Sequence, residues 1–292
     1  MNFLVYVLFI ILEKVIPLFP LSFLHFIVRL KGHLFYYLVP IRKKTAFYNL
    51  KLAFPDKTKR EISKIIKGCY VNVLTVIAEF FYMKKFSRDD LFRIIKMTNI
   101  ELIHEKLKLG KGIILISAHY GNWELTAYGV SQMFNKPFNV IVKEQANKKI
   151  DERINMIRSG KGNSMIDMKD ARAVLSLLKE NKIAAMLGDQ SAPVENVKVN
   201  FFVKDVPTFE GAARFAIKTG AAVLFGVSQR NKDNTYSLTL HDIDTTKYKG
   251  STEENIKALT QEHVELLIEY IKQRPDHWLW FHRRFKHLKQ FD

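Results

Sequence analysis

Short runs of β-branched and other apolar residues alternate with helix-length segments beyond about residue 98, and this alternation limits the possible folds more than any other feature. Strands are expected at 113–117, 138–142, 183–187, 222–228 and 237–241, and helices at 123–134, 171–181, 211–218 and 253–274. Strands that alternate with crossover helices form a mostly parallel sheet. The sequence therefore predicts an α/β fold, with a mostly parallel mixed sheet flanked by helices.

The N-terminal segment has a different composition. Residues 3–12 are apolar without interruption, and a second apolar stretch at 15–28 contains two prolines and a histidine. Neither reaches the ~18–20 residues of a membrane span. Basic and aromatic residues follow at 29–44, which is typical of a segment that lies in a bilayer interface. Interfacial or single-span anchoring is therefore expected here, with buried core helices as the alternative.

Helical periodicity continues through 60–95, where Ser87 is expected to cap a helix that has Asp89 and Asp90 in its first turn. The change from helices to alternating strands and helices falls at 94–98. We expect three parts: membrane-anchoring helices at 1–45, a helical segment at 46–97 and the α/β core at 98–292.

Charge and composition narrow the possible partners. Among 292 residues, 46 Lys and Arg outnumber 29 Asp and Glu, so the net charge is +17 with neutral histidines. Such a surface attracts nucleic acid, an anionic membrane or an acidic protein. The aromatic content of 12% and the lack of nucleic-acid-binding motifs favour lipid over nucleic acid, which is not expected as a partner. A single cysteine, Cys69, excludes a disulfide framework, and no metal site is expected.

The segment from Ser117 to Glu124 (SAHYGNWE) carries the clearest chemical signal. His119 follows an apolar strand, Gly121 and Asn122 suit a turn and a helix N-cap, and Glu124 falls in the first turn of the next helix. A carboxylate bound to one ring nitrogen leaves the other free as a general base. His119 and Glu124 are therefore candidates for a base and its orienting acid, with backbone N–H groups near Gly121 and Asn122 for an oxyanion. A structural histidine is the alternative.

Several motifs in order resemble the bacterial lipid A biosynthesis acyltransferase family, the late (secondary, lauroyl/myristoyl-type) acyltransferases. His119–Glu124 is similar to that family's His-x4-Asp/Glu box, and Gly188-Asp189-Gln190 is similar to its P-D-Q box with glycine in place of proline. Further similar segments are Arg42 with residues 49–55 and Glu61, residues 153–159, Phe201-Phe202 with Val206-Pro207-Thr208, and Trp280 to Lys286 (WFHRRFK).

The resemblance implies a glycerolipid-acyltransferase-like fold and O-acyl transfer. The acyl group would come from a thioester of acyl carrier protein or CoA, and the acceptor would be a hydroxyl of a lipid A precursor, with no cofactor. His119 would act as base with Glu124. Substrate-binding roles would fall to Asn122, Arg158, Asp189, Gln190 and Arg283, since a guanidinium group binds phosphate well. The enzyme would work at the inner (cytoplasmic) membrane, bound to anionic lipid, with its active site on the cytoplasmic face.

Two alternatives remain open from the sequence. The same chemistry could act on another glycolipid, a glycerolipid or an aminolipid, because the motifs do not separate these acceptors. A protein of another class, a non-enzymatic basic membrane-binding protein, would use His119 and Glu124 only structurally.

Overall fold

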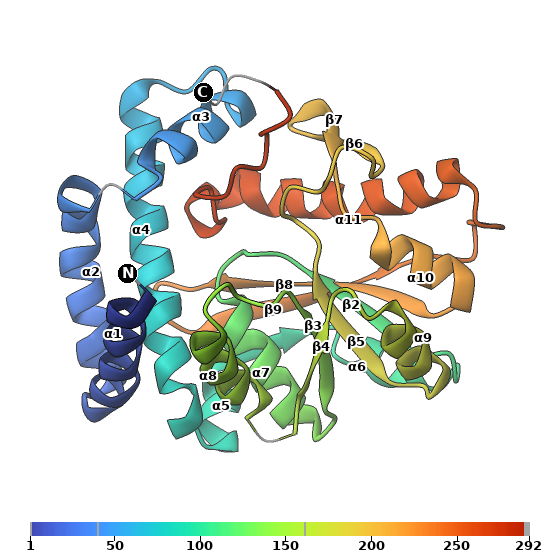
Figure 1. The fold of residues 1–292 in the computed structure, drawn as a ribbon, viewed down its shortest axis with the longest axis horizontal. Helices are drawn as coiled ribbons and strands as arrows, with labels where there is room; N and C mark the ends of the chain where they lie inside the picture. The colour runs from blue at the N-terminus through green and yellow to red at the C-terminus, as the bar shows by residue number, and fades with distance from the viewer. Residues whose placement is uncertain (1, 40, 161, 289–292) are drawn as a thin grey trace.

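A seven-stranded sheet forms the centre of the protein (Figure 1). The computed structural model describes residues 2–39, 41–160 and 162–288. The strands of the sheet are β1 (Ile95–Thr98), β2 (Ile113–Ser117), β3 (Phe138–Val142), β4 (Ser164–Asp167), β5 (Ile183–Leu187), β8 (Ala222–Arg230) and β9 (Tyr236–Ile243). Their order is β1-β9-β8-β2-β5-β3-β4, and all neighbours are parallel except β8 and β9. The predicted α/β fold with a mostly parallel mixed sheet is confirmed.

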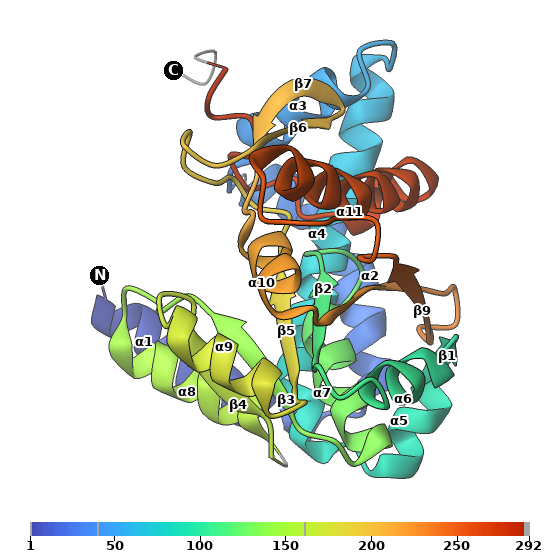
Figure 2. The ribbon, with the colours of Figure 1, turned by 90° about the vertical axis from the view of Figure 1, so that its right-hand side faces the viewer.

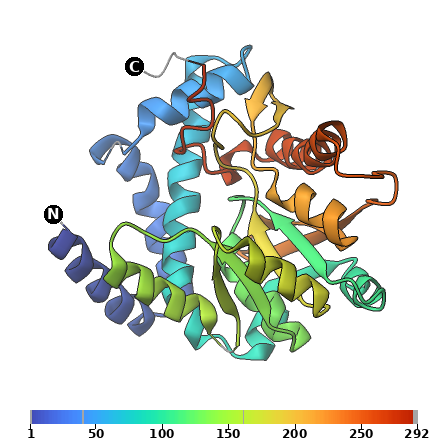
Figure 3. The ribbon, with the colours of Figure 1, turned by 45° about the vertical axis from the view of Figure 1, so that its right-hand side comes forward.

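Helices cover the sheet and extend beyond it (Figures 2 and 3). They are α1 (Asn2–Val15), α2 (Leu21–Leu38), α3 (Lys43–Ala53), α4 (Lys59–Tyr82), α5 (Arg88–Ile94), α6 (Glu101–Leu107), α7 (Trp123–Phe134), α8 (Lys148–Ser159), α9 (Ala171–Lys179), α10 (Gly211–Thr219) and α11 (Glu253–Gln273). Strands β6 (Lys198–Phe201) and β7 (Val203–Pro207) form a separate hairpin. The expected strands and helices of the core are all present, whereas strands β1, β4, β6 and β7 and helices α6 and α8 were not predicted.

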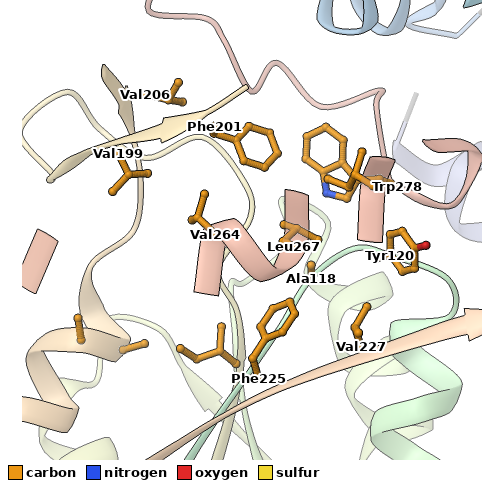
Figure 4. Close-up of a cluster of buried hydrophobic side chains, with 14 of the residues drawn as sticks. Ala118, Tyr120, Val199, Phe201, Val206, Phe225, Val227, Val264, Leu267 and Trp278 are labelled. Carbon is orange, nitrogen blue, oxygen red and sulfur yellow. The ribbon is translucent and has the colours of Figure 1, made fainter. Parts of the chain in front are cut away.

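Alternate residues of each central strand enter two different cores, because successive side chains of a strand point to opposite faces. Ile114 and Phe225 pack on the face covered by α10 and α11. Ile113 and Leu224 pack on the other face, against α7. Figure 4 shows part of the first core, where Phe225 lies below Leu267 of α11. Burial of both faces explains why these strands are continuously apolar.

Side chains fix where the helices of the second segment begin. Thr58 and Glu61 form a capping box at the start of α4, and Ser87 and Asp90 form one at the start of α5. The predicted cap at Ser87 is thus confirmed. By length and composition, residues Lys59–Lys85 could cross a membrane, but 56% of the apolar window is buried inside the protein.

The two N-terminal helices contact different parts of the protein: α2 packs on α4, and α1 on α8. Helix α2 packs along α4, where a Cβ on Gly32 would lie 2.7 Å from the Val71 side chain. Helix α1 runs beside α8, where Arg153 Nη2 is 2.6 Å from Glu13 Oε2 (Figure 3). Among the described residues, most of the large apolar side chains that are exposed to solvent lie between Phe3 and Ile41. The division at 45 and 97 stays a prediction.

A buried carboxylate joins α2, α4, α7 and β9. Glu79 of α4 is 1% exposed and accepts hydrogen bonds from His25 Nε2 (2.7 Å), Asn122 Nδ2 (2.5 Å) and the Tyr236 hydroxyl (2.5 Å). Because a buried carboxylate is costly unless it is fully hydrogen-bonded, this network holds α2 and α4 in one position against the loop that follows β2.

We expect the Glu79→Ala variant to lose about 3 kcal/mol or more of unfolding free energy, because it leaves three buried donors without an acceptor, each costing about 1–3 kcal/mol. Denaturant titration of the full chain measures this. The control is Glu269→Ala, which breaks an exposed pair with Lys272 and should cost less than about 1 kcal/mol. Equal losses in the two variants would contradict the role of Glu79.

The free energy of unfolding should also decrease as the pH is lowered, because of His263 on α11. Burial lowers the pKa of His263 to about 4 from an ordinary value of 6.5. Below pH 6.5 the unfolded chain therefore gains a proton that the folded protein does not bind. This difference reduces the unfolding free energy by up to about 1.4 kcal/mol per pH unit until the pH reaches about 4. Denaturant titrations at several pH values measure how steeply the unfolding free energy depends on pH between about 4 and 6.5. This dependence should be weaker in His263→Gln than in the wild type. An equal dependence in the two proteins would refute the role of His263.

Candidate active site

A cavity of about 1420 Å³ lies at the carboxyl ends of β2, β3 and β5. Open α/β sheets bind ligands at this edge. His119, Trp123 and Gln190 are among the residues that line the cavity. Within the described parts of the chain, no three His, Cys, Asp or Glu side chains come together in a way that could hold a metal ion.

The sheet order brings His119 and Asp189 together. β2 and β5 are neighbours with Ser117 opposite Leu187, and each of the two polar residues follows its strand by two positions. His119 Nδ1 lies 2.8 Å from Asp189 Oδ1, and the His119 backbone N–H donates to Asp189 Oδ2 at 3.0 Å. One carboxylate thus fixes both the loop and the ring of His119.

A tryptophan completes the surroundings of Asp189. Trp278 Nε1–H donates to Asp189 Oδ2 at 2.8 Å, and Asp189 is 4% exposed. Burial alone would raise the pKa of Asp189, but the neighbouring His119 imidazole and the hydrogen bonds from His119 and Trp278 outweigh it and lower the pKa below its ordinary value. Asp189 is therefore an anion at neutral pH, and it accepts a hydrogen bond from the Nδ1–H group of His119. Figure 4 shows Trp278 beside Phe201 of the β6–β7 hairpin.

The other ring nitrogen of His119 faces the cavity residues. Gln190 Nε2 lies 3.2 Å from His119 Nε2, and the Trp123 ring packs edge-on against the imidazole with centroids 5.0 Å apart. An amide N–H donates to an unprotonated ring nitrogen. Both contacts of the ring therefore agree on one tautomer, with the proton on Nδ1 and, on Nε2, a lone pair that accepts from Gln190.

Glu124 does not make the contact that was expected of it. Its carboxylate accepts from Arg158 Nε at 2.9 Å and Arg158 Nη2 at 2.5 Å, and from Trp123 Nε1 at 3.2 Å. Because α7 begins at Trp123, adjacent side chains project about 100° apart. When Trp123 packs on His119, Glu124 is turned toward α8. The carboxylate that binds the His119 ring is Asp189.

Asn122 and Gly121 hold the loop in place. Asn122 is fully buried: its Oδ1 accepts from Leu125 N–H to cap α7, and its Nδ2 donates to Glu79. The Gly121 N–H donates to His277 O at 3.0 Å, so this group is not free to bind an oxyanion. Gly121 has a φ of 61°, and a Cβ there would lie 1.9 Å from Ser228 O, so only glycine fits.

The predicted arginines differ in their surroundings. Arg158 lines the cavity but binds Glu124 with two nitrogens, and the charge of Glu124 outweighs burial and raises the pKa of Arg158. Arg283 is exposed and lines the cavity. Its neighbour Arg284 is buried and donates to Pro207 O and Thr208 Oγ1, both at 2.6 Å. Arg284 therefore anchors the C-terminal segment to the β6–β7 hairpin.

The deeper part of the cavity is apolar and lies between the sheet and α7. Its lining residues there include Leu115, Val130, Phe138, Val140, Leu238 and Leu240. Phe138 pairs with Ile183 and Ile183 with Ile113, four residues below Ser117. At about 3.3 Å per residue, the lined strands extend roughly 13 Å below the site. A single cavity thus connects a polar His119 mouth with an apolar interior.

Sequence reasoning missed two residues that the site depends on, Trp278 and Glu79. Trp278 lies two residues before the WFHRRFK motif, and its partner is 89 residues away. Glu79 is the one charged residue in a mostly apolar helical stretch at 70–81, which is a signal for a buried, paired carboxylate.

Known proteins are similar to this chain along nearly its whole length. A family model described as "Bacterial lipid A biosynthesis acyltransferase" matches residues 1–287. The lipid A biosynthesis lauroyltransferase of Escherichia coli (strain K12) is 25% identical over 252 residues, covering 84% of this chain and 79% of that enzyme. The lipid A biosynthesis palmitoleoyltransferase of the same strain is 23% identical with the same coverage.

A relative with a different name is similar over a comparable length. The phosphatidylinositol mannoside acyltransferase of Mycolicibacterium smegmatis (strain ATCC 700084 / mc(2)155) is 21% identical, covering 80% of each chain. All three relatives are acyltransferases by name. Since the family model extends over almost every residue from the N-terminal helices to the WFHRRFK segment, the protein belongs to the bacterial lipid A biosynthesis acyltransferase family and is an acyltransferase.

Proposed function

We propose that the protein transfers a fatty acyl group from a thioester of acyl carrier protein or CoA to a hydroxyl of a lipid A precursor. His119 is the general base in this proposal, and Asp189 orients it. The observation that carries the proposal is the 2.8 Å contact between His119 Nδ1 and Asp189 Oδ1 at the mouth of a cavity with an apolar interior. Because the chain belongs to a family of acyltransferases, an enzyme is favoured over the alternative of a non-catalytic membrane-binding protein.

In the proposed reaction, His119 Nε2 takes the proton of the acceptor hydroxyl as its oxygen attacks the thioester carbonyl. The ion pair with Asp189 stabilises the imidazolium that forms. Collapse of the tetrahedral intermediate breaks the C–S bond, and the imidazolium returns its proton to the leaving thiolate. Proton transfer of this kind contributes about 10²–10⁴-fold to the rate.

The oxyanion of the intermediate needs a donor close to the base. The Gln190 side-chain amide, 3.2 Å from His119 Nε2, is the donor best supported by position. When the acceptor hydroxyl takes its place on Nε2, the two N–H groups of this amide can donate to the oxyanion. It replaces the Gly121 N–H of the sequence hypothesis, which already donates to His277 O. A neutral amide stabilises negative charge as it develops without a proton-transfer step of its own.

The cavity mouth has a charge that suits a phosphorylated acceptor. Basic side chains that line the cavity are Arg42, Lys143, Lys148, Arg158, Arg283 and Lys286. Glu124, Glu144 and Glu210 are the acids among the lining residues, and Glu124 is already paired with Arg158. Guanidinium groups bind phosphate through two parallel hydrogen bonds. We assign Arg283 to a phosphate of the acceptor or of the donor, with Arg158 contributing when it exchanges partners.

Membrane attachment is proposed for the N-terminal helices. Phe3, Leu4 and Leu8 of α1 and Phe26 and Leu30 of α2 are more than half exposed. An exposed apolar surface of this extent marks a membrane or protein contact, and the net charge of +17 favours an anionic bilayer. We propose that the enzyme lies on the inner (cytoplasmic) membrane with its active site on the cytoplasmic face.

A second acceptor class is favoured by one specific observation. The mycobacterial relative is named for phosphatidylinositol mannoside, a mannosylated glycerolipid by that name. The same His119–Asp189 geometry serves any lipid alcohol, so another glycolipid, glycerolipid or aminolipid is the alternative acceptor. Mass spectrometry of lipids from cells with and without the gene separates these, since the lipid that loses one acyl chain is the acceptor.

We expect Asp189→Asn to lower kcat by about 10²–10⁴-fold, nearly as much as His119→Ala, because the ring loses its orienting anion. Glu124→Gln is the matched control, since it makes the same chemical change on the carboxylate that binds Arg158 instead, and it should lower kcat far less. Steady-state transfer from an acyl thioester, with thermal unfolding to confirm folding, gives these values. A greater loss in Glu124→Gln than in Asp189→Asn would overturn the assignment.

We further expect Ala185→Leu to shift the preference toward shorter acyl chains. Ala185 lines the apolar part of the cavity at the level of Leu115 and Val140, so a larger side chain fills space that the end of a long chain would occupy. Values of kcat/KM for thioesters of increasing chain length measure the shift. The opposite change, Phe138→Ala, should favour longer chains. The same optimum in both variants would place the acyl chain elsewhere.

A further inference from the structure

A second cavity, of about 450 Å³, lies behind the loop that carries His119. It is lined by residues of α2, α4, the end of β8 with the turn that follows it, and the segment that follows α11. It shares no lining residue with the large cavity of the candidate active site. It is therefore a separate compartment of the fold, on the side of the molecule where the N-terminal helices pack.

The lining of this second cavity is strongly basic. Arg29, Arg230, Lys232 and Arg274 face one carboxylate, Asp276, among the described lining residues. Arg274 forms an ion pair with that carboxylate, and its Nε lies 3.2 Å from Asp276 Oδ1. Within the described parts of the chain, the other three cations of this lining, Arg29, Arg230 and Lys232, have no direct carboxylate partner. Like charges held close together repel unless an anion lies between them.

Arg230 is the clearest sign of a missing anion. It is 9% exposed, and its Nε–H donates to the Tyr236 hydroxyl at 2.8 Å. Its Nη2 is buried and has no acceptor among the described residues, and His277 Nδ1, also in the lining, is likewise buried without a partner. The buried carboxylate of Glu79 is linked to Arg230 only through the Tyr236 hydroxyl among the contacts of the described residues. A phosphate oxygen would provide the acceptor that the guanidinium lacks.

The surface beside the cavity indicates what carries the phosphate. Arg29 of α2 lines the cavity together with His33, one turn further along the helix. The adjacent row of the same helix consists of Phe26, Leu30 and Leu34, which are 61%, 63% and 48% exposed. Residues four apart on a helix form one continuous stripe. A charged pocket bordered by an exposed apolar stripe matches a lipid with an anionic head and two acyl chains.

We propose that this second cavity binds the phosphate of an anionic glycerophospholipid whose acyl chains lie along the Phe26–Leu30–Leu34 stripe. The site is distinct from the acyl-transfer site and does not rest on the proposed reaction. It makes α2 a lipid-specific anchor. The bound phosphate contacts Arg230, which reaches the loop of His119 through Tyr236, Glu79 and Asn122.

The test measures binding of soluble short-chain lipids by the full-length protein. The probes are dihexanoyl phosphatidylglycerol, dihexanoyl phosphatidylcholine and inorganic phosphate, each titrated below the micelle concentration. We expect phosphatidylglycerol to bind at least about tenfold more tightly than the other two. Arg29→Gln and Arg230→Gln should each weaken phosphatidylglycerol binding by about tenfold or more, the usual effect of losing a charged hydrogen bond.

Two exposed basic residues provide matched controls. Lys31 lies on α2 two residues from Arg29 but does not line the second cavity, and Lys179 of α9 lines neither cavity. Lys31→Gln and Lys179→Gln should each change the Kd for phosphatidylglycerol by less than about twofold. Since Arg29 and Lys31 are both exposed, this pair remains informative even if Arg230→Gln fails to fold.

Three results would overturn the proposal. Equal binding of phosphatidylglycerol and phosphatidylcholine, which both carry a phosphodiester, would show that the site does not select a lipid with a net negative charge. Equal losses in Arg29→Gln and Lys31→Gln would show general surface attraction instead of a site. Inorganic phosphate that binds as tightly as phosphatidylglycerol would show a small-anion site and remove the lipid assignment.

Discussion

The hydrogen-bonded contact between Asp189 and His119 is the interaction on which the rest of the site depends. Asp189 sits at the end of β5, and its two oxygens bind the ring and backbone of His119 and the indole of Trp278. Three segments that are far apart in the sequence therefore meet at one buried carboxylate. Removing its charge would release the ring, the loop after β2 and the C-terminal segment together. The position of His119 thus depends on the order of the strands in the sheet, not on the HYGNWE segment alone.

The parts of this arrangement that local sequence could predict are those that local physics determines. The strand 113–117, the cap at Ser87 and the placement of His119 after a strand depend on apolar patterning and on residues within one turn. The partner of His119 depends on which strands are neighbours. The resemblance predicts a substrate-binding role for Asp189, but the adjacency of β2 and β5 that places Asp189 on His119 is not encoded within either segment.

Glu124 illustrates the same limit from the other side. Five residues from His119, it was the natural partner by spacing, yet the helix that starts at Trp123 turns it to Arg158 of α8. Asn122 was expected at a helix start and does cap α7, but its second contact, with Glu79 of α4, could not be foreseen from spacing. Polar residues near a site are thus found from sequence more readily than their partners are.

The most direct test of the central claim is ¹⁵N NMR of the full-length protein with labelled histidine, recorded at mildly alkaline pH. The account predicts that His119 carries its proton on Nδ1 and leaves Nε2 unprotonated, and that this signal changes in Asp189→Asn but persists in Glu124→Gln. A wild-type spectrum with the proton on Nε2, or a spectrum altered by Glu124→Gln and not by Asp189→Asn, would contradict it.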